Sequence, residues 1–141
     1  MALTSEATTL WFGDRDTGSG TTSLDSSDAA EFPVTWQARS EGVVGYTNPE
    51  ELLAASHSAC FSMALSGRLT KAGHPPESLQ VTAAVTFQAG EGVTGSHLLV
   101  SAKVPGMTEE DFQVVAQDAK ENCPISKALA GIPITIEANL A

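Results

Sequence analysis

The sequence predicts a single α+β domain over residues 1–141, in which antiparallel sheets pack around a long buried central helix. Residues 47–70 read as one helix with no charged side chain between positions 52 and 65. The runs 81–87 and 97–104 alternate in polarity, as antiparallel strands with one buried face do. Strands, helix, strands, helix and strand follow one another along the chain, an order typical of an α+β fold.

The central helix has a well-marked start. Asn48 stands at the N-cap position, Pro49 at the first helical position and Glu51 three residues past the cap. Prolines at positions 75 and 76 end it near residue 71 or 72. A helix that is apolar on all sides must be covered on all sides, so we expect an intimate homodimer in which a second copy supplies the other side. The alternative is that the second helix and a curled sheet cover it within one chain.

The remaining elements follow from turn and capping signals. We expect a strand at 8–12 ending in a turn at Gly13 and Asp14, a short strand at 21–24 and a third strand at 32–39. A second helix begins at Thr108. A break at Cys123, a short helix from Pro124 that stops at Gly131, and a last strand from Ile132 complete the chain.

Composition narrows the function classes. The net charge is -10, which argues against nucleic acid and anionic membranes as partners. No leader-like N-terminus and no apolar run of about 18 residues is present, so we expect a soluble cytoplasmic protein. The two cysteines do not form a Cys-x-x-Cys motif, and the three histidines fall in different elements. This spacing gives only a weak signal for a metal site.

Cys60 and Cys123 are the candidate reactive groups, although two small buried hydrophobic residues would look the same in sequence. An arginine such as Arg39, if it lay against a thiol, would stabilise the thiolate and lower the thiol pKa. Glu50 stands in the first helical turn, where an acid also favours the helix dipole. His57 lies one turn before Cys60 and is either a catalytic base or a neutral histidine bonded locally.

Two cysteine motifs carry a family resemblance. Thr-Asn-Pro-Glu-Glu-Leu-Leu-Ala-Ala-Ser-His-Ser-Ala-Cys-Phe-Ser-Met-Ala-Leu-Ser at 47–66 and Asn-Cys-Pro-Ile-Ser-Lys-Ala-Leu at 122–129 resemble the OsmC/Ohr family of thiol peroxidases, closest to its OsmC branch. The resemblance implies a peroxidatic Cys60, a resolving Cys123, an activating Arg39 and its carboxylate partner Glu50, with Glu51 as a further candidate. It also implies an intertwined homodimer without metal, flavin or haem.

The reaction implied by this resemblance belongs to the oxidative stress response. An organic hydroperoxide is reduced to an alcohol, Cys60 passes through a sulfenic acid to a disulfide with Cys123, and an external dithiol, lipoyl-type or a small thiol, restores both. Ten residues of helix separate Glu50 from Cys60, about 15 Å, so we expect each site to combine two subunits. Two alternatives remain: a non-enzymatic dimer that binds a hydrophobic ligand, and a general thiol-disulfide reductase.

Overall fold

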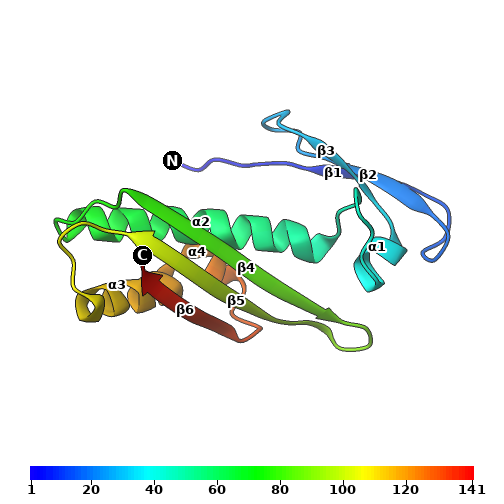
Figure 1. Ribbon diagram of the computed structural model, residues 1–141. Helices are drawn as coiled ribbons and strands as arrows, with labels where there is room; N and C mark the ends of the chain where they lie inside the picture. Colours follow the sequence, from blue (N-terminus) through cyan, green and yellow to red (C-terminus); the bar gives the residue numbers. More distant parts are fainter. The chain divides into compact units, whose positions relative to one another are not determined.

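A computed structural model describes all residues from Met1 to Ala141 and divides into two compact units, 1–52 and 53–141. Both α-helices and β-strands contribute, which confirms the mixed α+β class (Figure 1). The elements, in chain order, are β1 Thr8–Phe12, β2 Ser19–Ser23, β3 Glu31–Val34, α1 Trp36–Ser40, α2 Pro49–Lys71, β4 Ser78–Gln88, β5 Gly92–Lys103, α3 Glu109–Asn122, α4 Pro124–Ala128 and β6 Ile134–Leu140. None of the helices is long and apolar enough to pass through a membrane.

The N-terminal unit is built on a three-stranded antiparallel sheet in the order β1-β2-β3. The turn between β1 and β2 forms where the sequence predicts it, because Gly13 adopts a positive φ of 92°. The Asp14 carboxylate accepts hydrogen bonds from the backbone N–H groups of Asp16 and Thr17, at 2.9 and 2.8 Å. The predicted strand at 8–12 is confirmed, and the predicted short strand at 21–24 lies at Ser19–Ser23.

The predicted third strand, 32–39, is only half right. The strand β3 ends at Val34, and residues Trp36–Ser40 form the short helix α1. Thr35 causes the change, because its hydroxyl accepts a hydrogen bond from the backbone N–H of Ala38 at 3.1 Å and so caps the helix. The buried Ala38 also accepts a hydrogen bond from the Asn48 side chain at 3.3 Å, which ties α1 to the start of α2.

The C-terminal unit contains a second three-stranded sheet in the order β4-β5-β6. The strands β4 and β5 form the predicted antiparallel hairpin, whereas β5 and β6 are parallel, so the expectation of antiparallel sheets is wrong here. The reason is the crossover through α3 and α4, which returns the chain to the end of the sheet where β5 began. Each predicted helix start is confirmed: the Thr108 hydroxyl caps α3 by accepting from the Asp111 N–H, and Asn48 caps α2 by accepting from the Glu51 N–H.

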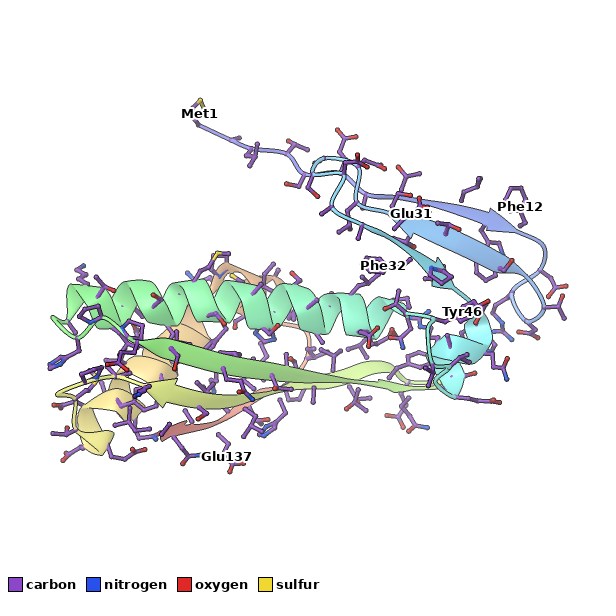
Figure 2. All side chains as sticks on the ribbon, turned by 45° about the horizontal axis from the view of Figure 1, so that its top comes forward. Met1, Phe12, Glu31, Phe32, Tyr46 and Glu137 are labelled. Carbon is purple, nitrogen blue, oxygen red and sulfur yellow. The ribbon has the colours of Figure 1, made fainter.

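The core of the C-terminal unit lies on one face of this sheet, where α2, α3 and α4 also lie (Figure 1). Its largest side chains are fully buried; they come from α2, β5 and α3 and are Phe61, Leu65, Leu69, Leu98, Val100 and Phe112. Each contributes roughly 1.5–3 kcal/mol on burial. Glu137 of β6 points away from the helices, on the exposed face of the sheet (Figure 2).

The central helix is buried along one side only within a single chain. Every fourth residue from His57 through Phe61 and Leu65 to Leu69 is fully buried. The opposite side carries small or apolar residues that are exposed, among them Met63, whose relative exposure is 75%. The prediction of a helix buried all round is therefore not met by one chain.

Candidate active site

Cys60 and Cys123 come together although they lie on different elements. Cys60 projects from the middle of α2, and Cys123 stands at the break between α3 and α4, as the sequence predicts. The backbone N–H of Cys123 closes α3 on the carbonyl of Ala119 at 2.9 Å, and Pro124 begins α4. The two sulfurs are 3.1 Å apart, within hydrogen-bonding distance, and both cysteines are free. Their spacing allows a disulfide after a small movement.

The two thiols differ in accessibility. Cys123 is fully buried, with no exposed surface, in the cluster that contains Phe112 and Ala119. Cys60 is partly exposed and packs against the edge of the same cluster. A molecule arriving from solvent therefore meets Cys60 before it meets Cys123.

The surroundings also shift the two thiol pKa values in opposite directions. Burial, and then the hydrogen bond with Cys123, raises the pKa of Cys60. Burial acts to raise the pKa of Cys123 as well, but the Ser126 backbone N–H, the Cys60 thiol and the Ser126 hydroxyl stabilise its thiolate and leave the pKa lowered. Within this unit, the buried thiol is thus the one that loses its proton more easily.

His57 does not face solvent, and its hydrogen-bond partners come from other elements and not from its own helix. Its side chain is fully buried, and burial lowers its pKa. The Nδ1 atom lies 2.7 Å from the Ser96 hydroxyl, and Nε2 lies 2.8 Å from the Ser126 hydroxyl. The sequence gives no signal for Ser96, and Ser126 lies within the second cysteine motif without any sign there of a contact with His57.

Arg39 and Glu50 form the second pair of predicted site residues, and both belong to the N-terminal unit. The Arg39 Nε donates to the Glu50 Oε1 at 2.8 Å. The Glu50 side chain is only 5% exposed, whereas that of Arg39 is 33% exposed. The other carboxylate oxygen, Oε2, is buried and has no hydrogen-bond partner. The carboxylate of Glu51, the further candidate, accepts from the Thr47 hydroxyl.

A cavity of about 520 Å³ lies beside this ion pair in the same unit. Its lining is mainly apolar; it includes the two tryptophans, two arginines and the start of α2, and consists of Thr9, Trp11, Arg15, Thr22, Val34, Thr35, Trp36, Arg39, Pro49 and Leu52. The Arg15 guanidinium lies 4.5 Å from the centre of the Trp36 ring. The tryptophan and Arg15 side chains are residues that the sequence did not identify as part of a site.

The structure therefore brings the four predicted residues together as two pairs, one in each unit. No group of three His, Cys, Asp or Glu side chains is arranged to hold a metal ion. Two kinds of chemistry are available. Cys60 and Cys123 form a dithiol in the unit that also contains the buried His57, and Arg39, oriented by the Glu50 carboxylate, lies beside an apolar cavity.

Known proteins resemble this chain along its whole length. The family described as OsmC-like protein matches residues 41–137. Peroxiredoxin OsmC of Escherichia coli strain K12 is 39% identical over 99% of each chain. OhrA of Bacillus subtilis strain 168, named an organic hydroperoxide resistance protein, is 34% identical over 64% of this chain and 66% of its own. An organic hydroperoxide resistance protein from Elizabethkingia anophelis has a TM-score of 0.70 at 30% identity, covering 100% of this chain and 97% of that one.

Proposed function

The chain belongs to the OsmC-like protein family, and from this membership we propose that it is a cysteine-based peroxidase that reduces organic hydroperoxides to alcohols. The observation that carries the proposal is the pair of sulfurs 3.1 Å apart, one accessible and one buried. An accessible thiol meets the oxidant, and a buried neighbour traps the oxidised product before it is oxidised further.

Cys60 performs the first step. Its thiolate attacks the terminal oxygen of the hydroperoxide, the O–O bond breaks, and the alkoxide leaves as an alcohol after taking a proton. Cys60 is then a sulfenic acid. Its partial exposure supports this order, because Cys123 is fully buried.

Cys123 performs the second step. Its sulfur attacks the Cys60 sulfenic acid, water leaves and a disulfide forms. The lowered pKa of Cys123 suits this attack, since the thiolate is the nucleophile. An external dithiol, of a lipoyl type or a small thiol, then reduces the disulfide by exchange.

Arg39 supplies the activation that Cys60 lacks in its own unit, where its pKa is raised. A guanidinium beside the thiolate lowers the thiol pKa and stabilises negative charge on the peroxide oxygens. Glu50 orients Arg39 through the 2.8 Å bond. The apolar cavity beside this pair suits the organic tail of a hydroperoxide better than hydrogen peroxide.

Each site combines two subunits of a homodimer. Glu50 and Cys60 are ten residues apart on α2, which at 1.5 Å per residue separates their backbones by about 15 Å. Glu50 therefore serves the Cys60 of the partner chain. The exposed apolar side of α2 around Met63 supports the dimer, and the buried, unpaired Oε2 of Glu50 supports a donor from outside this unit.

Peroxide consumption distinguishes this function from its two rivals. The protein is incubated with an organic hydroperoxide and a dithiol, and loss of peroxide is compared with oxidation of the dithiol. A peroxidase consumes one peroxide per dithiol, whereas a general thiol-disulfide reductase oxidises the dithiol only when a disulfide substrate is added. A non-enzymatic dimer that binds a hydrophobic ligand does neither, and that outcome would overturn the proposal.

A further inference from the structure

We propose that His57 and Ser126 form a proton relay that takes the thiol proton of Cys123 when this cysteine attacks the oxidised sulfur of Cys60. The inference rests on the proposed function for the roles of the two cysteines. It is carried by two buried hydrogen bonds that join Ser96 and Ser126 through the imidazole, and by the place of the buried Ser126 three residues after Cys123 at the start of α4. Peroxide reduction as described above does not use these hydrogen bonds.

The imidazole is held at both nitrogens. Nδ1 lies 2.7 Å from the Ser96 Oγ, Nε2 lies 2.8 Å from the Ser126 Oγ, and the whole side chain is inaccessible to solvent. A hydroxyl can both donate and accept, so the ring can carry its proton on either nitrogen. Both direct partners of the ring are uncharged, and burial keeps the imidazole neutral. A neutral ring is a base with a free lone pair.

Ser126 connects the ring to the thiol. It stands in α4, three residues after Cys123, and is itself buried. Its hydroxyl and its backbone N–H both stabilise the Cys123 thiolate. Cys123 has no exposed surface, and in the reduced protein its thiol donates to the Cys60 sulfur. When Cys60 is oxidised and is itself the target of the attack, the Ser126 hydroxyl is the neighbouring group that can take this proton.

Two sets of hydrogen-bond directions describe the transfer. In the reduced protein the Cys123 S–H donates to the Cys60 sulfur. Once Cys60 is oxidised, the relay requires the Cys123 S–H to turn to the Ser126 oxygen, while the Ser126 O–H donates to Nε2 and Nδ1–H donates to Ser96. In the transfer, the S–H proton moves to the Ser126 oxygen and the Ser126 proton moves to Nε2. The result is a thiolate that accepts from the Ser126 O–H and an imidazolium whose Nε2–H donates to the Ser126 oxygen. Ser96 holds the tautomer that leaves Nε2 free to accept.

The step balances without an outside oxidant. The Cys123 sulfur forms the S–S bond, the S–O bond of the Cys60 sulfenic acid breaks, and hydroxide leaves with the electron pair. The Cys60 sulfur is formally reduced and the Cys123 sulfur formally oxidised. The step itself yields the disulfide, one hydroxide and a protonated His57. When the imidazolium gives up its proton again, the overall product is one water.

The test uses an aromatic disulfide reagent in place of peroxide, so it does not depend on peroxidase activity. The reagent releases one aryl thiolate when it forms a mixed disulfide with one cysteine of the protein. The second aryl thiolate is released when the other cysteine attacks that mixed disulfide and displaces the bound aryl group. We expect Ser126→Ala and His57→Gln to leave the first release unchanged and to slow the second on the order of a hundredfold. Glutamine can still bond both serines but cannot take up a proton.

Ser62→Ala is the matched control, because it removes one hydroxyl from α2 that bonds only the carbonyl of Ser58 at 2.7 Å. It should leave both releases unchanged. Circular dichroism verifies that each variant is folded. A wild-type second release in folded His57→Gln would overturn the relay, and so would equal slowing in Ser62→Ala, which would indicate packing alone.

The wild-type protein gives a second, independent readout. A relay predicts that heavy water slows the second release more than the first, and an equal solvent effect on both releases would overturn it. If peroxide is not reduced but the second release behaves as described, the relay stands and the proposed function fails. If peroxide is reduced, but the rate of the second release is the same in both variants and in heavy water as in the wild type in ordinary water, the relay fails and the proposed function stands.

Discussion

The sulfurs of Cys60 and Cys123 lie 3.1 Å apart although 63 residues separate them in the chain. A disulfide needs about 2.0 Å, so a movement of roughly 1 Å closes the bond. Cys60 is held by the packing of α2, and Cys123 by the end of α3 and the start of α4. The fold therefore holds the two thiols close enough to form a disulfide with little movement.

Replacing each cysteine should separate the two chemical steps. Cys60→Ser is expected to abolish peroxide reduction, and Cys123→Ser to retain a single turnover, because only Cys60 is accessible to the substrate. Mass spectrometry of Cys123→Ser after one equivalent of peroxide should find oxidation at Cys60. First oxidation at Cys123 in the wild type, which its lowered pKa would favour, would reverse the roles.

Arg39→Ala should slow the peroxide step while the protein stays folded. Burial and Cys123 raise the pKa of Cys60, and a nearby guanidinium is the group that would lower it. We expect the midpoint of the pH profile of Cys60 alkylation to lie at least one pH unit higher in the variant. One unit corresponds to a loss of about 1.4 kcal/mol of interaction between the guanidinium and the thiolate. Arg15→Ala is the control, since its guanidinium stacks on Trp36. An upward shift in Arg15→Ala alone would assign the activation to Arg15.

Local signals in the sequence predicted most of the fold. Asn48 and Thr108 cap the helices they were expected to cap, and the Cys123 break lies where Pro124 predicts it, because these signals act over three or four residues. The parallel pairing of β6 was missed, since strand direction depends on where a long crossover returns. The helix α1 was missed because the alternating apolar residues after Phe32 concealed the cap at Thr35.

Pairings in the candidate site were less predictable than the residues themselves. The motifs named both cysteines, Arg39 and Glu50, but periodicity says nothing of which side chains meet across the fold. The bond between Arg39 and Glu50 spans 11 positions and depends on the turn between α1 and α2. The contacts of His57 with two serines, 39 and 69 positions away, could not be read from spacing at all.

His57 should make folding stability depend on pH. Burial lowers its pKa from the ordinary value near 6.5, so below about pH 6.5 the unfolded chain binds a proton that the folded chain does not. Stability is therefore lost as the pH falls, by up to about 1.4 kcal/mol per pH unit until the folded pKa is reached. Urea unfolding between about pH 7 and pH 5 should give a flatter dependence for His57→Gln. An equal dependence in both proteins would show that His57 does not titrate on unfolding.

Met63→Glu should weaken the proposed dimer. Met63 is 75% exposed on the apolar side of α2, so a charge there costs little in one chain but much in an interface. We expect at least a tenfold rise in the dimer dissociation constant, about 1.4 kcal/mol, by sedimentation. Leu99→Glu is the control, because Leu99 is 47% exposed on β5, on the face of the sheet that points away from the core. Loss of the dimer only in Leu99→Glu would place the interface on the sheet.

Subunit mixing tests whether one site draws on two chains. Glu50→Ala and Cys60→Ser proteins should each be inactive, because one lacks the residue that orients Arg39 and the other lacks the reactive sulfur. If Glu50 serves the partner's thiol, a mixed dimer collects both lesions in one site and leaves the other whole. An equal mixture that exchanges freely then regains about a quarter of wild-type activity, since half of its dimers are mixed and each has one intact site.

The control for this mixing is a pair of lesions that belong to one unit. Cys60 and Cys123 meet within a single chain at 3.1 Å, so mixing Cys60→Ser with Cys123→Ser should restore no catalytic turnover. Mixed dimers are verified by a mass tag on one chain. If mixed dimers of Glu50→Ala and Cys60→Ser are proven but activity does not recover, the proposal of a site shared between subunits is wrong. Glu50 then acts on the Cys60 of its own chain. Recovery in that mixture but not in the cysteine control requires a carboxylate that crosses between subunits, because about 15 Å of α2 separates it from its own cysteine.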